Sequence, residues 1–177
     1  KVHPHIKAEE GDIRNLRFND NYFQYVLAFG LYHNLDISDL DRSLKETYRV
    51  MKNTGKIVAS FRADNLQTLL TDFIANFKSK NIKSKNKVFH KLNFKKKEFC
   101  EIFEKHGFEV EEILQVENMP FLYKFEFFRQ QSHKKFNENK ARIEGYRLSL
   151  LGNLIQSLLI NFFPDQFCNV YVIIAKK

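Results

Sequence analysis

The stretch that decides the fold is residues 11–61, which read GDIRNLRFNDNYFQYVLAFGLYHNLDISDLDRSLKETYRVMKNTGKIVASF. A short strand-like run leads to Asp12, and a turn cluster at residues 19–21 precedes an apolar run at residues 22–31. A capped amphipathic helix follows, and an Asn-Thr-Gly turn separates it from a second apolar strand at residues 56–61. Strand, helix and strand in this order predict a βαβ unit, the building block of a parallel sheet.

The helix inside this unit carries local signals of its own. Ser38 is a suitable N-cap, and Asp41 three residues later resembles a capping box. One apolar stripe at helical spacing is formed by Leu40, Leu44, Tyr48 and Met51. These signals predict a helix that begins shortly after His33 and packs one face onto the sheet.

The rest of the chain predicts further elements of one domain spanning residues 1–177. They are a helix capped by Asp64 or Asn65, a helix over 93–106 that ends at Gly107, a strand over 108–116 and a buried closing strand over 167–175. Residues 62–97 and 119–165 are predicted to be helical or loop insertions, which together are candidates for a substrate lid.

Composition limits the functional classes. The chain has 177 residues, of which 44% are hydrophobic, and this fits one folded domain and excludes a disordered chain. Cys100 and Cys168 are far apart, which indicates a reducing compartment, so a cytoplasmic protein is expected. Polar residues interrupt the longest apolar region, 148–163, so no membrane span is predicted. His3 and His5 lack a third ligand, so no metal site is predicted.

The formal net charge of +8 leaves acidic partners open. Residues 78–97 contain nine lysines and no carboxylate, a pattern that suits either contact with nucleic acid or a solvated loop. Apolar residues break the run and arginine is absent from it, which favours the solvated loop. Nucleic acid is therefore not the expected partner.

In order and spacing, these pieces resemble the C-terminal two-thirds of a class I S-adenosylmethionine-dependent methyltransferase of the small-molecule type. The matching segments are residues 11–26, GLYHNL at 30–35, LKETYRVMKNTGKIVAS at 44–60, KKKEFCEIFEKHGFEVEEI at 95–113 and FCNVYVIIAKK at 167–177. The resemblance implies an α/β fold, with a Rossmann-like sheet, flanking helices and a final antiparallel strand. It also implies S-adenosylmethionine as the cofactor.

Carried over by position, the resemblance assigns roles to residues at the carboxyl ends of the strands. Asp12 would accept a hydrogen bond from the adenine amino group, and the Ile13 N–H would contact the same ring. The methionine part of the cofactor would lie against Ala28 and Phe29. The substrate side would be formed by Tyr32, His33 and Phe61, which agrees with the rule that open α/β sheets bind ligands beyond the carboxyl ends of their strands.

His33 is the candidate catalytic residue, because an imidazole titrates near neutrality and can accept a proton from the methyl acceptor. A histidine that only orients its loop through hydrogen bonds is an equal alternative. For Tyr32, a role as pocket wall is favoured over a role as acid.

Within residues 1–177, no glycine pair has the spacing of the family's glycine-rich turn. This turn and the first strands of the sheet are expected upstream of Lys1, so the chain is predicted to lack them. A methyltransferase with a small-molecule acceptor is the favoured function. The alternatives are an RNA or protein methyltransferase that uses the lysine-rich loop, and a non-catalytic scaffold without the cofactor cradle. The 119–165 insertion also leaves a homodimer open.

Overall fold

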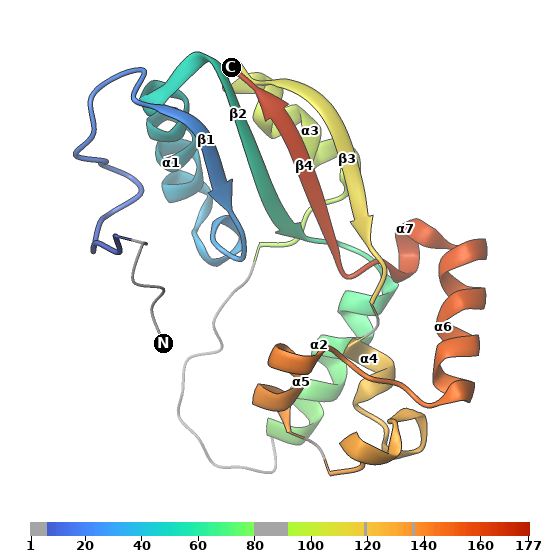
Figure 1. Ribbon diagram of the computed structural model, residues 1–177. Helices are drawn as coiled ribbons and strands as arrows, with labels where there is room; N and C mark the ends of the chain where they lie inside the picture. Colours follow the sequence, from blue (N-terminus) through green and yellow to red (C-terminus); the bar gives the residue numbers. More distant parts are fainter. Residues whose placement is uncertain (1–6, 80–91, 119, 136) are drawn as a thin grey trace.

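The computed structural model describes residues 7–79, 92–118, 120–135 and 137–177 (Figure 1). Its strands are β1 (Phe23–Ala28), β2 (Met51–Arg62), β3 (Glu109–Val116) and β4 (Val170–Lys176). Its α-helices are α1 (Ile37–Val50), α2 (Leu66–Ser79), α3 (Lys96–Lys105), α4 (Pro120–Tyr123), α5 (Glu138–Glu144), α6 (Leu150–Phe162) and α7 (Pro164–Phe167). Short 3-10 turns are η1 (Tyr32–Asn34), η2 (Glu126–Phe128) and η3 (Gln131–His133).

The strands form one mixed sheet in the order β1-β2-β4-β3. β1 runs parallel to β2, with Ala28 opposite Ala59, as the predicted βαβ unit requires. β4 runs antiparallel to both of its neighbours, so that Ile173 lies between Ala59 and Ile113. The predicted α/β sheet with an antiparallel final strand is therefore confirmed. β1 lies at one edge of this sheet.

α1 begins where an acceptor for its first free N–H groups is available. Asp36, not Ser38, is the N-cap, and its Oδ1 accepts the Asp39 N–H at 2.8 Å. The capping prediction at Ser38 is wrong, because its hydroxyl instead donates to the same Asp36 Oδ1 at 2.8 Å. Of the predicted stripe, Leu40 and Leu44 are buried beneath the helix and Tyr48 packs against the main core, whereas Met51 is the first residue of β2.

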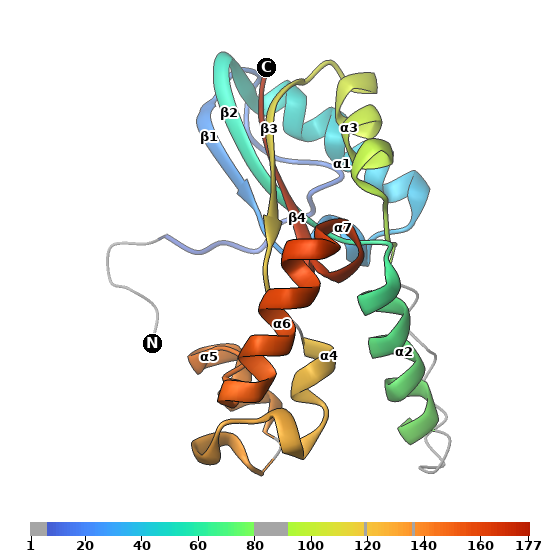
Figure 2. The same ribbon diagram turned by 90° about the vertical axis from the view of Figure 1, so that its right-hand side faces the viewer.

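The main core lies between one face of the sheet and the two helices α1 and α3, which Figure 2 shows on the same side. Phe61, Phe99 and Phe103 are fully buried there and pack ring against ring. On the opposite face of the sheet, Tyr25 and Leu27 of β1 are 71% and 72% exposed. Alternation of side chains along β1 thus separates a buried row from an open row.

A second, smaller core joins the helices that lie beyond the carboxyl end of β2 (Figure 1). Its buried members are Leu122, Tyr123, Ala141, Leu148 and Ile160. Residues 120–135 and 137–167 contain the helices α4–α7 and the turns η2 and η3, and α2 packs against α4 and α7. His3, His5 and most of the lysine-rich run lie outside the described residues.

Among the described residues, none of the helices combines the length and the apolar character needed to cross a bilayer.

Candidate functional site

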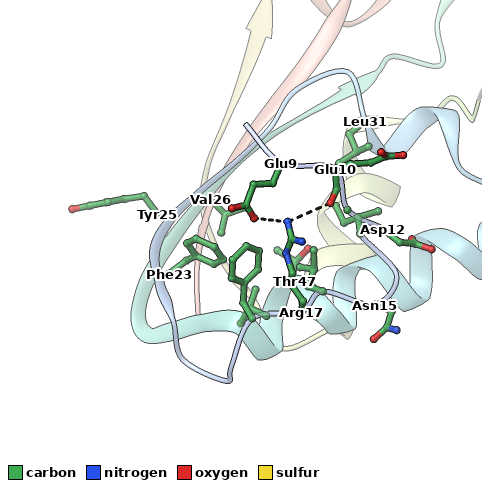
Figure 3. A pocket seen from close by; sticks show the side chains of 15 residues that line it. Glu9, Glu10, Asp12, Asn15, Arg17, Phe23, Tyr25, Val26, Leu31 and Thr47 are labelled. Carbon is green, nitrogen blue, oxygen red and sulfur yellow. Dashed lines mark hydrogen bonds and ion pairs between the residues drawn. The ribbon is translucent and has the colours of Figure 1, made fainter. Parts of the chain in front are cut away.

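A cavity of about 560 Å³ opens beside the edge strand β1 (Figure 3). Its outer wall is residues 9–18, here called the strap, and its inner wall is formed by β1 and α1. The floor is mainly apolar, with Phe23 and Val26 from β1, Leu31 from the loop after β1, and Val50 from α1. Such a space suits a flat, mostly apolar ring that carries polar groups at its edge.

Arg49 and Glu46 of α1 hold the strap against this helix. Arg49 donates through Nη2 to the Leu16 carbonyl and through Nη1 to the Phe18 carbonyl, both at 2.9 Å. It also pairs with Asp20 at 2.6 Å and with Glu46 at 2.8 Å. Glu46 in turn accepts the Leu16 N–H at 2.9 Å. These bonds give the cavity a wall of defined position.

Asp12 lies at the rim of the cavity and is bound by Arg14. The Arg14 Nε lies 2.9 Å from Oδ1, and its Nη2 lies 2.8 Å from Oδ2. These hydrogen bonds lower the pKa of Asp12 from 3.8 to about 2. Ile13, the next residue, also lines the cavity and packs against the main core.

The loop after β1 is held over the end of β2. The Gly30 N–H donates to the Ser60 hydroxyl at 3.0 Å, and the Asn34 side-chain amide donates to the Gly30 carbonyl at 2.6 Å. Gly30 has φ +67°, a conformation that glycine adopts without strain. Ala28 is buried beneath this loop, whereas Phe29 is 58% exposed.

Tyr32 and Phe61 lie in the main core. Tyr32 is fully buried, its hydroxyl lies 3.0 Å from the Thr47 hydroxyl, and burial raises its pKa to about 12. Phe61 is also fully buried and stacks on Tyr32 at a ring distance of 6.3 Å. His33 is partly buried, with its ring 6.4 Å from that of Phe61.

The structure therefore divides the predicted site residues into two groups. Asp12 and Ile13 line the cavity. Ala28, Phe29, Tyr32, His33 and Phe61 gather at the carboxyl ends of β1 and β2, and none of them is among the residues that line it. The functional roles of all seven stay predictions.

Two residues that join these groups were missed from the sequence. Thr47 lines the cavity and also bonds to Tyr32, and Leu31 lines it from the loop. Thr47 follows Leu44 by three positions on the apolar stripe of α1, and a polar residue on that face was the available signal. No sequence pattern pointed to the contacts of Arg14 and Arg49, because their partners depend on the path of the strap.

A protein-family model described as a methyltransferase domain matches residues 1–59. Two curated proteins are similar over 69 residues: the ubiquinone/menaquinone biosynthesis C-methyltransferases of Rickettsia bellii, at 35% identity, and Rickettsia prowazekii, at 37% identity. The match covers 38% of this chain and 27% of each curated protein. It thus spans about a quarter of the length of these relatives.

Solved structures match nearly the whole chain. A SAM-dependent methyltransferase from Archaeoglobus fulgidus superposes with a TM-score of 0.57 at 22% identity, over 96% of this chain and 66% of that one. A SAM-dependent methyltransferase from Methanosarcina mazei gives 0.56 at 14% identity, over 94% and 65%. At identities this low, the structural matches show the fold alone. They confirm the predicted Rossmann-like architecture.

Proposed function

We propose that this chain, which has the fold of class I S-adenosylmethionine-dependent methyltransferases, binds S-adenosylmethionine and takes part in transferring its methyl group to a small-molecule acceptor. The observation that carries the proposal is the cavity between the strap and β1. Asp12 and Ile13 lie in the wall of this cavity, and its floor is mainly apolar. The match of residues 1–59 to a methyltransferase-domain model covers the same elements.

The adenine of the cofactor is assigned to this cavity. The Asp12 carboxylate is ionised at neutral pH, so it is an acceptor for the exocyclic amino group, and the adjacent Ile13 supplies a backbone N–H. Val26 and Leu31 would cover the faces of the ring. The exposed Phe29 lies at the end of β1, where the methionine part would pass.

When bound, the cofactor supplies a methyl group on a sulfonium, which is a strong leaving group, so the protein's main contribution is alignment and exclusion of water. His33 is assigned to the acceptor side, where its imidazole would take up the acceptor's proton or orient the loop. Tyr32 and Phe61 are buried and stack on each other, and they would support that loop by packing beneath it. The insertions that contain α2 and α4–α7 would form the lid.

For the acceptor, a quinone-like ring is the first class to test. The support is that the curated relatives are named ubiquinone/menaquinone biosynthesis C-methyltransferases. Methyl transfer to carbon requires the ring carbon to be activated by removal of a proton from a neighbouring hydroxyl, and this gives a base such as His33 a task.

Calorimetric titration with S-adenosylhomocysteine tests the cofactor assignment. We expect the wild-type chain to bind, and Asp12→Asn to weaken binding about tenfold, because a charged acceptor is lost. Glu101→Gln is the matched control, since this exposed carboxylate pairs only with Lys97 at 3.5 Å among the ion pairs of the described residues. Absence of heat with the wild-type chain would reject the proposal.

Transfer of a labelled methyl group to a quinone-like ring tests the acceptor assignment. His33→Ala should lower the transfer rate while S-adenosylhomocysteine affinity stays within about twofold, because His33 is assigned to the acceptor and not to the cofactor. An equal loss of both quantities would assign His33 to loop orientation.

A further inference from the structure

Arg14 occupies most of the hydrogen-bonding capacity of Asp12. The Arg14 backbone N–H donates to Oδ1 at 2.9 Å, Nε lies 2.9 Å from Oδ1 and 3.1 Å from Oδ2, and Nη2 lies 2.8 Å from Oδ2. A carboxylate offers about four acceptor directions. Three N–H groups of Arg14 take up most of them, because its Nε–H is shared between the two oxygens, so an incoming amino group would compete with the guanidinium for this carboxylate.

The same guanidinium also contacts a second carboxylate, that of Asp39. The Arg14 Nη1 already donates to the Asp39 Oδ2 at 2.9 Å, and Asp39 is only 18% exposed. Asp39 lies in the first turn of α1, where the helix dipole favours a negative charge. Arg42 holds its other oxygen at 2.6 Å, which fixes the orientation of this carboxylate. Arg14 can thus leave Asp12 without losing an ionic partner.

We propose that Arg14 is an internal competitor for the adenine at Asp12, and that Asp39 receives Arg14 when a ligand binds. The inference rests on the proposed function, because it concerns how the same cavity admits the cofactor. The exchange swaps one ion pair for another. The Arg14 guanidinium moves onto Asp39, and the released Asp12 oxygen accepts the adenine amino group. Arg14 thereby sets the affinity of the site from a position that the ligand need not touch.

The test is calorimetric titration of the full chain with S-adenosylhomocysteine. Arg14→Met removes the competing donors and leaves the backbone N–H that orients Asp12, so we expect binding to tighten about two- to fivefold, the range of an exposed ion pair. Lys45→Met is the matched control. It removes the same charge from an exposed position on α1, and its ion pair is with Asp41. We expect its affinity to equal that of the wild type.

Asp39→Asn separates competition from a structural effect. In the wild-type background it removes the receiving carboxylate, so binding should weaken by about the same factor. In the Arg14→Met background it should have no effect, because no guanidinium has to move. Any one of three outcomes would overturn this inference and leave the proposed function standing. They are unchanged or weaker binding by Arg14→Met, equal tightening by Lys45→Met, and the same effect of Asp39→Asn in both backgrounds. Absence of binding by every variant would overturn the proposed function with it.

Discussion

At the scale of single residues, the ionisation of the cavity rim depends on one neighbour. Asp12 is exposed, so burial does not set its charge, and its low pKa comes from the Arg14 guanidinium and the Arg14 backbone N–H. An ionised carboxylate is the stronger acceptor for the adenine amino group, and the low pKa keeps Asp12 ionised over a wide pH range. The same contact makes the carboxylate less available.

The pH dependence of this pair has a defined sign. The pKa of Asp12 is about 2 in the folded chain, below its ordinary value of 3.8. The pair therefore stabilises the fold above about pH 4, and this contribution is lost as the pH falls through about 2. Carboxyl ¹³C chemical shifts should report a midpoint near 2 in the wild type. In Arg14→Met the midpoint should rise towards 3.8, and an unchanged midpoint would contradict the assignment.

Tyr32 illustrates a polar group that serves packing. Its hydroxyl bonds to Thr47, and the Thr47 hydroxyl also donates to the Ser43 carbonyl at 2.7 Å. Tyr32→Phe thus leaves Thr47 satisfied, and we expect the free energy of unfolding to fall by about 0.5–1.5 kcal/mol in urea titrations. Methyl transfer should be unchanged. A large loss of transfer in a stable variant would show that the hydroxyl acts at the site.

At the scale of elements, α1 is both a wall of the main core and the support of the strap. Leu40 and Leu44 face the core, whereas Glu46 and Arg49 hold residues 16–20 on a neighbouring part of the helix. One helix therefore aligns the sheet with the cavity wall. This coupling explains how a segment without regular structure keeps a defined position.

The planar guanidinium of Arg49 holds the strap on α1 through several hydrogen bonds at once. Arg49→Lys keeps the charge but cannot reach Leu16, Phe18 and Glu46 together. We expect the Leu16 amide to exchange its hydrogen at least about tenfold faster, because its bond to Glu46 opens more often. Arg42→Lys, on the same helix and 60% exposed, should leave that amide unchanged. Equal exchange in both variants would remove Arg49 from this role.

The end of α3 depends on one glycine. Gly107 follows the C-cap His106 with φ +91°, and a side chain there would come within 3.1 Å of the Tyr48 ring. Gly107→Ala should lower the free energy of unfolding by about 1–3 kcal/mol. Gly11→Ala has open space around its Cβ and should be near neutral in the same urea titration. A neutral Gly107→Ala would show that the turn can relax.

At the scale of the whole molecule, the described chain has two cores. One lies under the sheet, and the other joins α4, α5 and α6. The second contains a polar chain in which the Tyr123 hydroxyl lies 2.9 Å from His133 Nδ1, and His133 Nε2 lies 3.2 Å from Glu144. These residues come from α4, η3 and α5, so their hydrogen bonds connect three segments of the helical part.

His133→Phe should loosen the helical part and leave the sheet intact. We expect amides of residues 120–162 to exchange about tenfold faster, while amides of β4 keep their protection. Ser132→Ala changes the exposed neighbour on η3 and should have no effect. Equal loss of protection in the sheet would show that the two cores unfold as one unit.

The sequence by itself determined the order of the elements and several of their ends. The strand–helix–strand order of residues 11–61, the buried Leu40 and Leu44 and the stop at Gly107 are present, and of the two predicted caps, Asp64 and Asn65, it is Asn65 that accepts the Thr68 N–H. The predicted Asn-Thr-Gly turn is instead part of β2, which begins at Met51. Each of these signals depends on neighbours within one or two helical turns or on alternation along one strand. Local sequence contains all of the information that they need.

Only the tertiary structure decided which side chains meet. The burial of Tyr32, the hold of Arg49 on the strap and the contact of Arg14 with Asp39 join residues that lie 15 to 33 positions apart. Pairing over such separations depends on how the chain returns across the sheet, and no local pattern encodes that path.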